Sequence, residues 1–476
     1  MVFSSLTFVC LFLPTVVAAY FLSPAHLRNF VLVIASIIFY AWNIPLALVL
    51  VLSLIAVNFE LGKTIGNQTG IGRNNAIFFG VGLNLLVLIF FKYADFLLEN
   101  LNSVLMLVSD WRVPLPHIAL PLGISFFTFH IISYLVDVYR GRVRAQTSRV
   151  DFMLYIINFP QLIAGPIIRY HQIAEQLRLR PVRFADINAG TIRFAIGLAK
   201  KLLVANPIGA VADQIFATPP HQLYSGTVWL GALCYGLQIY FDFSGYSDMA
   251  IGIGRIFGFR FPENFNYPYA AMSLQDFWRR WHMTLTMWFR DYVYIPLGGN
   301  RHGPWKTARN LWIVFLLTGA WHGASWNFIV WGLWHGLFLW LERLASLKAI
   351  LERAPPILRH GYSMFVVLIG WVFFRSADRD YAVGFLTRMS GFGAIDNGLL
   401  VSANVSVPMM TLIVIACCMG LPLWPRLRAI GEHIAFHPNG AIAMDLGRMV
   451  LVAALMMLSL ATMAVEEYNP FIYFRF

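Results

Sequence analysis

The sequence predicts an all-α polytopic membrane protein, and three observations support this fold class. Hydrophobic residues make up 59% of the 476 residues, and charged residues make up only 12%. A typical soluble domain has about 25% charged residues. Many apolar runs are long enough, at about 1.5 Å of rise per residue, to cross all or part of a hydrocarbon core about 30 Å thick. We expect about 10 to 13 transmembrane helices, with re-entrant and interfacial helices, around a central cavity.

The apolar runs set the expected order of the helices. They lie near residues 6–22, 29–42, 44–61, 75–91, 118–138, 152–168, 191–216, 226–241, 311–341, 362–374, 408–424 and 447–465. No Lys or Arg precedes the first run, and the first cation is Arg28, which predicts an uncleaved first helix with its N-terminus outside. No soluble domain can be separated, so we expect one integral membrane domain over residues 1–476, with C-terminal helices at 362–465.

The formal net charge of +12 does not indicate a nucleic-acid partner. The cations lie in short loops beside apolar runs, where membrane topology and anionic lipids account for them. The four cysteines also lie in or beside apolar runs and lack metal-ligand spacing. We therefore interpret the cysteines as small buried hydrophobic residues and expect no metal site.

The run at 152–168 is flanked by arginines on both sides. Four precede it and four follow it: Arg140, Arg142, Arg144 and Arg149, then Arg169, Arg178, Arg180 and Arg183. A spanning helix would place one cluster on the wrong side of the membrane, and Pro160 and the Gly165-Pro166 pair break the run. We predict a re-entrant segment with both clusters cytoplasmic. Because broken backbone at membrane depth must be buried in protein, the segment should form part of a cavity wall.

His322 lies in an uncharged, tryptophan-rich stretch, 311–341. A polar imidazole at membrane depth is costly unless it faces a protein cavity, which makes His322 a candidate functional residue. An imidazole, with an ordinary pKa of about 6.5, is also the side chain best suited to accept a proton at neutral pH. The alternative is a histidine that hydrogen-bonds between helices. No motif supports a catalytic role for His130 or His335, and we interpret both as packing or interhelical hydrogen-bonding residues.

The segment 274–301 carries the densest polar chemistry of the chain. Its apolar residues recur at helical spacing on one face, and its arginines fall largely off that face: Phe277, Trp281, Leu285 and Trp288 against Arg279, Arg280 and Arg290. This pattern predicts an amphipathic helix in the membrane interface, with its arginines at headgroup level. A surface anchor without further function is an open alternative. His282, within the segment, offers a second imidazole to a cavity near His322.

Several long motifs follow one another along the chain. They are PLGISFFTFHIISYLVDVYRG (121–141), FPQLIAGPIIRY (159–170), YFDFSGYSDMAIGIGRIFGF (240–259), DFWRRWHMTLTMWFRDYVYIPLGGNR (276–301), TGAWHGASWNFIVWGLWHG (318–336) and the terminal FIYFRF. In this order they resemble the membrane-bound O-acyltransferase family (MBOAT) over essentially the whole chain, with a signature core at about 118–341. Within the family, the chain is most similar to the membrane subunits that acetylate bacterial exopolysaccharides such as alginate.

The resemblance implies a reaction and two catalytic residues. An acetyl group would pass from a cytoplasmic thioester, acetyl-coenzyme A, across the bacterial inner membrane for O-acetylation of an exopolysaccharide. His322, in WHGASW, would be the catalytic base or an acylated nucleophile. His282, in RRWH, would occupy the second signature position, where many eukaryotic relatives carry asparagine. The implied partners are a periplasmic acetyltransferase and the polysaccharide, and no cofactor would be bound permanently.

Charged residues in two other apolar runs are further candidates. Asp242 and Asp248 lie six residues apart, so on one regular helix they point in different directions. One of them could orient a catalytic imidazole, and a helix-locking ion pair is equally open. Lys200 and Lys201 could attract the phosphates of coenzyme A, and cations that snorkel to the interface are the alternative. The sequence has no glycine-rich phosphate loop, and Arg279 and Arg280 are the other weak candidates for coenzyme A binding.

The tail 471–476 alternates aromatic, basic and apolar residues. An interfacial anchor is one interpretation. The tail is also similar to the end of a small companion protein in teichoic-acid D-alanylation, so Tyr473 could carry the acyl group transiently or the tail could dock the periplasmic partner. Two other functions stay open for the chain. They are D-alanyl transfer to teichoic acid and proton-coupled transport along buried His, Asp and Lys, although a transporter would more often show two related halves.

Overall fold

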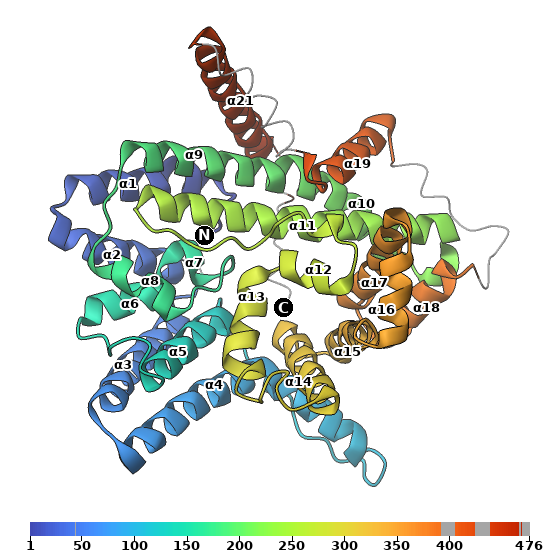
Figure 1. Cartoon of the computed structure of the whole chain (residues 1–476), viewed down its shortest axis with the longest axis horizontal. Helices are drawn as coiled ribbons and strands as arrows, with labels where there is room; N and C mark the ends of the chain where they lie inside the picture. The colour runs from blue at the N-terminus through green and yellow to red at the C-terminus, as the bar shows by residue number, and fades with distance from the viewer. Residues whose placement is uncertain (43, 392–404, 424–437, 466–467, 469–476) are drawn as a thin grey trace. The chain divides into compact units, whose positions relative to one another are not determined.

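The computed structural model describes residues 1–42, 44–391, 405–423, 438–465 and 468, and the side chains of 438–444 are outside this description. Every regular element in these ranges is a helix (Figure 1), as the sequence predicted. The chain divides into two compact units. Unit 1 comprises Met1–Thr191 with Ala250–Pro262, and unit 2 comprises Ile192–Met249 with Glu263–Arg475. The expected single domain over 1–476 and its central cavity stay predictions.

Unit 1 contains the N-terminal helices. Its elements are the π-helix η1 (Thr7–Phe12), α1 (Leu13–Leu22), the 3₁₀ turn η2 (Ala25–Leu27), α2 (Arg28–Ala41), α3 (Pro45–Asn67), α4 (Gly70–Leu105), α5 (Ile124–Tyr139), α6 (Arg149–Ile157), α7 (Phe159–Leu162) and α8 (Tyr170–Arg178). Figure 1 shows α3, α4 and α5 side by side, and these three helices contact one another. The helix α2 packs against both α1 and α6.

Unit 2 contains the remaining elements, with two long helices shared between the units. The shared helices are α9 (Phe184–Ala199) and α11 (Ser225–Ile256). The others are η3 (Lys200–Ala205), α10 (Asn206–Ala217), η4 (Pro220–Gln222), η5 (Pro268–Ala270), α12 (Leu274–Arg280), α13 (Met283–Phe289), η6 (Arg290–Tyr294), α14 (Pro304–His322), α15 (Trp326–Leu341), α16 (Ala345–Arg353), α17 (Pro356–Arg375), α18 (Arg379–Met389), α19 (Val407–Met419) and α21 (Pro438–Val465).

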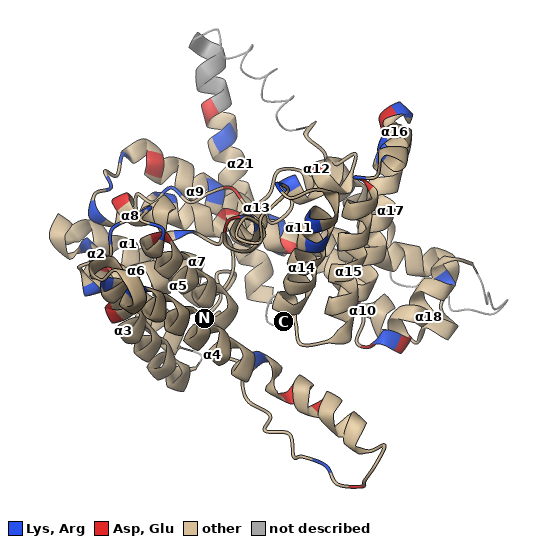
Figure 2. Cartoon of the chain, turned by 60° about the horizontal axis from the view of Figure 1, so that its bottom comes forward, with Lys and Arg blue, Asp and Glu red and all other residues tan. Residues whose placement is uncertain are grey.

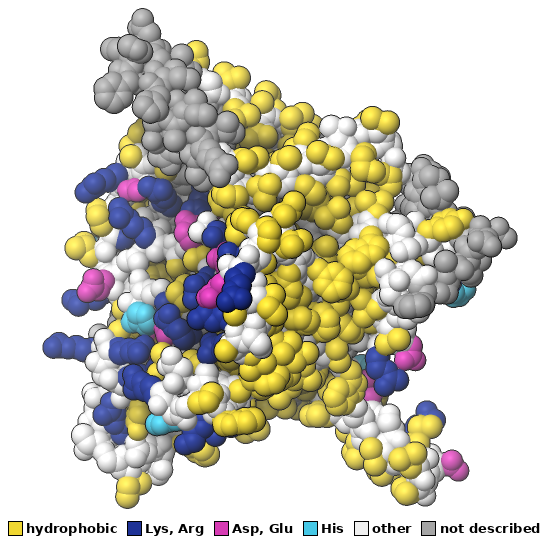
Figure 3. Space-filling view, turned by 45° about the vertical axis from the view of Figure 1, so that its right-hand side comes forward, with side chains coloured by type: hydrophobic (Ala, Val, Ile, Leu, Met, Phe, Trp, Pro, Cys, Tyr) yellow, Lys and Arg dark blue, Asp and Glu magenta, His cyan; other side chains and the backbone are white. Residues whose placement is uncertain are grey.

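The helices have the lengths and surfaces of a multi-pass membrane protein. In the described ranges, five are long and apolar enough to cross a membrane: Pro45–Asn67, Gly70–Leu105, Phe184–Ala217, Pro356–Arg375 and Asp445–Val465. Four shorter apolar helices accompany them: Thr7–Leu22, Ala25–Ala41, Ile124–Tyr139 and Val407–Met419. Figure 3 shows hydrophobic side chains over a broad part of the surface, which suits contact with lipid. The cysteines differ from expectation, because Cys234 is buried but Cys10 and Cys418 are exposed.

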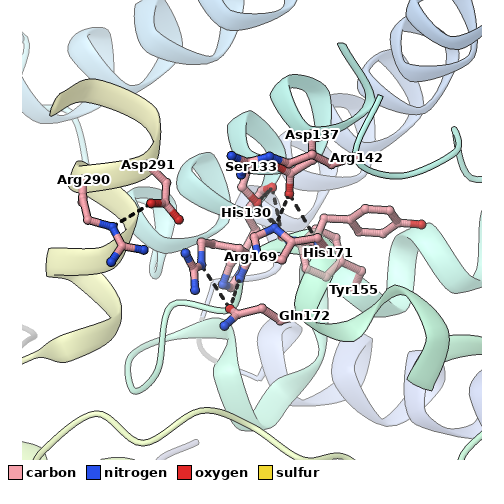
Figure 4. A network of polar contacts seen from close by, with 11 residues as sticks. His130, Ser133, Asp137, Arg142, Tyr155, Arg169, His171, Gln172, Arg290 and Asp291 are labelled. Atoms are coloured by element: carbon pink, nitrogen blue, oxygen red, sulfur yellow. Dashed lines mark hydrogen bonds and ion pairs between the residues drawn. The ribbon is translucent and has the colours of Figure 1, made fainter. Parts of the chain in front are cut away.

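The run expected to be re-entrant is broken and buried. The helix α6 ends at Ile157, α7 is a single turn, and Gly165 has a positive φ of 102°. One side chain of α6 and one of the neighbouring helix α5 satisfy part of its backbone (Figure 4). Tyr155 donates a hydrogen bond to the carbonyl of Ile168 (2.9 Å), whose N–H donates to His130 Nε2 (3.3 Å). This is the burial that irregular backbone needs at membrane depth. His130 therefore forms a hydrogen bond between α5 and the broken segment, as one of its two interpretations expected.

Arginines surround this broken segment within unit 1. Figure 2 shows Lys and Arg gathered around α6 and α8. Arg142, Arg149, Arg178 and Arg183 are exposed, whereas Arg169 is buried and bonds to Gln172. The prediction that both clusters face the cytoplasm is compatible with this arrangement and stays a prediction.

Candidate functional site

A break between two short helices positions His282. The expected single amphipathic helix is wrong here, because α12 ends at Arg280 and α13 begins at Met283. His282 adopts a left-handed backbone conformation with φ of 41°, which is uncommon for a residue with a side chain and is often found at functional sites. Phe277 and Trp281 of the predicted apolar face are buried, so this face packs within unit 2 rather than lying open as a lipid anchor.

Asn264 holds His282 from the preceding loop. The N–H of Met283 donates to the carbonyl of Asn264 (2.9 Å), which ties the helix break to that loop. The side-chain oxygen of Asn264 accepts from the Thr284 hydroxyl (2.8 Å) and N–H (3.3 Å), and lies 3.0 Å from His282 Nδ1. The side-chain nitrogen of Asn264 donates to the Ser247 hydroxyl (3.1 Å). Asn264, His282, Thr284 and Ser247 are all buried.

These contacts assign the tautomer of His282. The Asn264 oxygen is an acceptor, so His282 Nδ1 must donate, and the lone pair of the neutral ring is at Nε2. Nε2 is buried and has no hydrogen-bond partner among the described residues. Burial lowers the pKa of His282, which lies outside the five membrane-spanning helices, to about 3. The ring is therefore neutral at physiological pH and presents an unused acceptor atom.

His322 is the last residue of α14, in a tight hairpin with α15 that depends on two glycines. A Cβ atom at Gly319 would lie 2.3 Å from the carbonyl oxygen of Phe328, and one at Gly332 would lie 2.3 Å from the carbonyl oxygen of Phe315. Only glycine permits this approach, because real Cβ contacts do not fall below 3.0 Å. The hairpin holds His322, which is 4% exposed, at its closed end.

Aromatic rings surround His322 and connect it to His282. The His322 ring lies edge-on to Trp331 and Phe374, with ring centroids 4.9 Å and 5.1 Å away. The indole of Trp321 lies 4.9 Å from the His322 ring and 6.1 Å from the His282 ring, measured between centroids. The two predicted imidazoles thus flank the same indole within unit 2. Such apolar walls keep water from an activated acyl group, and an imidazole can accept and return a proton.

His335 packs among aromatic rings and shares Trp331 with His322, with centroids of the two imidazoles 5.1 Å and 4.9 Å from that of the indole. Its ring stacks against Phe277 and lies edge-on to Trp278, with centroids 6.3 Å and 5.2 Å away. A Cβ atom at Gly370 would lie 2.6 Å from His335 Nε2. These contacts agree with the interpretation of His335 as a packing residue.

The four charged candidates of the apolar runs form ion pairs within unit 2. Lys201 contacts Asp242 at 2.6 Å, and both side chains are almost fully buried. Lys200 contacts Asp248 at 2.6 Å, and Arg193 contacts the same carboxylate at 2.9 Å. Consecutive lysines on η3 point in different directions, and so do aspartates six residues apart on α11. Each lysine can therefore reach its own aspartate on the facing helix. This geometry supports the helix-locking alternative, and coenzyme A binding by these lysines stays a prediction.

The remaining candidates are placed as follows. Arg279 is exposed, and Arg280 contacts Asp276 at 2.9 Å, one turn earlier on α12. Tyr473, the possible acyl relay, lies outside the described residues.

The sequence analysis missed two polar groups that the structure reveals. Asn264, in the motif ENFNYP, orients His282, but no spacing rule connects residues in a loop with a helix break. Asp137 is a fully buried carboxylate on α5 of unit 1, and His171 Nδ1 lies 2.8 Å from it (Figure 4). A carboxylate in the apolar run ISFFTFHIISYLVDVY was the available signal for Asp137.

Comparison with known proteins gives consistent results. The model of the membrane-bound O-acyltransferase family (MBOAT) matches residues 142–374. The chain is 39% identical to the probable alginate O-acetylase AlgI of Azotobacter vinelandii, with 100% of both chains covered. It is 36% identical to the peptidoglycan O-acetyltransferase of Helicobacter pylori, over 83% of this chain and 81% of that protein. It is 31% identical to the teichoic acid D-alanyltransferase of Bacillus subtilis, over 46% of this chain and 58% of that protein.

Proposed function

Because the chain belongs to the membrane-bound O-acyltransferase family, we propose that it is an O-acetyltransferase for a bacterial exopolysaccharide such as alginate. Acetyl-coenzyme A in the cytoplasm is the acyl donor. The acetyl group crosses the inner membrane through this protein, and coenzyme A stays behind. A periplasmic acetyltransferase or the polymer itself receives the group. The full-length likeness to the alginate O-acetylases supports this acceptor class, and the D-alanyltransferase likeness covers less than half of the chain.

The observation that carries the proposal is the placement of His322 and His282 against one buried indole, Trp321. In the base route, His322 takes the proton of the acceptor hydroxyl as its oxygen attacks the thioester carbonyl carbon. The tetrahedral intermediate then collapses, the carbon–sulfur bond breaks, and the imidazolium returns the proton to the thiolate. With a pKa of about 3, His282 stays neutral at physiological pH, so it assists as an acceptor of hydrogen bonds at Nε2.

A nucleophile route uses the same residues. His322 attacks the thioester carbon, coenzyme A leaves as the thiol, and the acetyl-imidazole then transfers its acetyl group to the hydroxyl. The two routes differ in whether an acetylated enzyme forms. Rapid quenching of the Tyr473→Phe variant after mixing with labelled acetyl-coenzyme A in the absence of acceptor distinguishes them, since without the Tyr473 hydroxyl only the second route leaves label on the protein.

The test of the proposal is transfer of labelled acetyl groups by the purified full-length protein. His322→Ala should lower the rate by about 10²–10⁴-fold, the range for loss of a general base. The matched control is His302→Ala, which removes an exposed histidine of the same unit and should leave the rate unchanged. Wild-type polymer acetylation by His322→Ala at normal membrane levels would overturn the assignment. Substrate uptake without acyl turnover would instead identify a transporter, and labelling only by D-alanine would identify a D-alanyltransferase.

The acyl-relay role of Tyr473 belongs to this proposal as well. Tyr473→Phe removes the hydroxyl that would carry the acyl group and retains the ring. Loss of polymer acetylation with normal hydrolysis of the donor supports a relay or docking role. Full acetylation by this variant removes the relay.

A further inference from the structure

A basic pocket lies in unit 1, and the proposed reaction does not use it. Its volume is about 630 Å³, and it forms where the end of α1, the starts of α2 and α6, and the end of α8 meet. The described residues that line it include the cationic or titratable groups His26, Arg28, Arg178 and Arg180, and Asp151 is their one acid. The wall of this pocket therefore carries an excess of positive charge.

Arg28 and Arg180 are held by aromatic rings and backbone rather than by carboxylates. The guanidinium of Arg28 lies over the Tyr20 ring, 5.2 Å from its centroid, and that of Arg180 lies 5.8 Å from the same centroid. Arg180 Nε donates to the carbonyl of Phe257 (3.0 Å). In the part of the chain that the structure describes, Arg28, Arg178 and Arg180 form no ion pair.

The lone acid of the pocket is already engaged. Asn29 donates to the Asp151 carboxylate (2.6 Å) and to the carbonyl of Leu177 (2.8 Å). Burial lowers the pKa of Arg180, Tyr20 and the charge of Asp151 act in the opposite direction, and the neighbouring charge of Arg28 lowers it further. The charge balance of the pocket therefore favours an added anion.

An apolar groove adjoins the basic pocket, and the two share Phe30. The groove has a volume of about 490 Å³ and lies between α1 and α2, from Phe30 to Trp42. At about 1.5 Å per residue, this part of α2 is about 18 Å long, close to half of a hydrocarbon core of about 30 Å. Leu11, Ile38 and Trp42 line the groove and are exposed.

We propose that α1 and α2 bind an anionic phospholipid, with its phosphate in the basic pocket and one acyl chain in the apolar groove. The sequence predicts that Arg28 and the arginines beside α8 face the cytoplasm, where the bilayer surface is negatively charged. Guanidinium groups suit a phosphate because they donate several hydrogen bonds in one plane. The apolar groove is about as long as one leaflet of the bilayer is deep, which suits a lipid acyl chain. A soluble phosphate compound has no acyl chain to fill such a groove.

The test uses the purified full-length protein in detergent, titrated with phosphatidylglycerol or with phosphatidylcholine of the same acyl chains and followed by native mass spectrometry. The wild-type protein should prefer phosphatidylglycerol. Arg28→Gln with Arg178→Gln should weaken its binding about 30-fold, since each cation near an anionic surface contributes about a factor of five. The charge-matched control is Arg144→Gln with Arg183→Gln, two exposed arginines outside the pocket lining, which should retain the affinity.

A second pair of variants tests the groove independently of the charge. Ala19→Trp fills the groove from an exposed lining position, and Ala18→Trp adds the same ring at an exposed neighbour outside the lining. Only Ala19→Trp should weaken phosphatidylglycerol binding. Equal phosphatidylglycerol binding by the two arginine double variants, or by Ala19→Trp and Ala18→Trp, would overturn the proposal. Glycerol phosphate or coenzyme A that competes as well as the lipid would also overturn it, because the pocket would then serve a soluble phosphate.

Discussion

Replacement of Gly319 by alanine tests whether the α14–α15 hairpin positions His322. The added Cβ atom would lie 2.3 Å from the carbonyl oxygen of Phe328 and 3.2 Å from its carbon, and both are backbone atoms that cannot rotate away. The two helices must therefore separate by roughly 1 Å before the contact becomes an ordinary one. Overpacking of this kind costs about 1–3 kcal/mol.

The same displacement reaches the imidazole, since His322 follows Gly319 by one helical turn and closes the hairpin. Misplacement of a reacting group by about 1 Å costs about 10²-fold in rate. We expect Gly319→Ala to lower the rate of acetyl transfer by about that factor, and to lower the melting temperature of the protein in detergent. The rate is measured with purified protein and labelled acetyl-coenzyme A.

Gly361→Ala is the matched control for this prediction. Gly361 is an exposed glycine of α17, and a Cβ atom there would meet nothing within 4 Å. Alanine favours a helix over glycine by about 1 kcal/mol, so this variant should be as active as the wild-type protein and no less stable. Equal rates for Gly319→Ala and Gly361→Ala would refute the claim that the hairpin positions His322.

Three further predictions concern unit 2. Asn264→Ala should lower both stability and activity, because it removes the acceptor of three hydrogen bonds worth about 0.5–1.5 kcal/mol each. Asn264→Asp keeps the acceptor and should retain more of both in melting and rate measurements. Lys201→Met should cost about 3–5 kcal/mol, since it leaves the charge of Asp242 buried, and Lys201→Met with Asp242→Leu should recover much of the melting temperature. If the double variant has a raised KM for acetyl-coenzyme A, Lys201 serves the donor after all. In the folded state His282 has a pKa of about 3 and stays neutral, whereas in the unfolded chain its pKa is about 6.5. As the pH falls below about 6.5, the unfolded chain binds a proton that the folded protein does not, so the wild-type protein loses stability. His282→Asn should lose less melting temperature between about pH 7 and pH 5 than the wild-type protein does, and equal losses would contradict the burial of a neutral ring.

The all-helical membrane fold could be predicted from the sequence because hydropathy and helix length act locally. The break at 158–169 was also predictable, since Pro160 and Gly165-Pro166 interrupt a run that arginines flank. The break at His282 was not. The segment 274–289 keeps helical spacing across it, and the left-handed conformation of His282 depends on hydrogen bonds to Asn264, a residue in the preceding loop.

The same contrast applies to the charged candidates. A lysine next to an apolar run has the same local signature whether it binds a phosphate, reaches the interface or pairs with another helix, and only the geometry of η3 and α11 separates these cases. A buried ion pair contributes little net stability but is costly to break, so Lys201 and Asp242 act mainly to fix the register of η3 on α11. That register matters for the site because α11 also carries Ser247, to which Asn264 donates. The contacts from η3 through α11 to Asn264 and His282 all lie within unit 2. Weakening the Lys201 pair should therefore disturb the hydrogen bond between Asn264 and His282, which sets the tautomer of His282. It should affect His322 less, because the position of His322 depends on the glycines of its own hairpin.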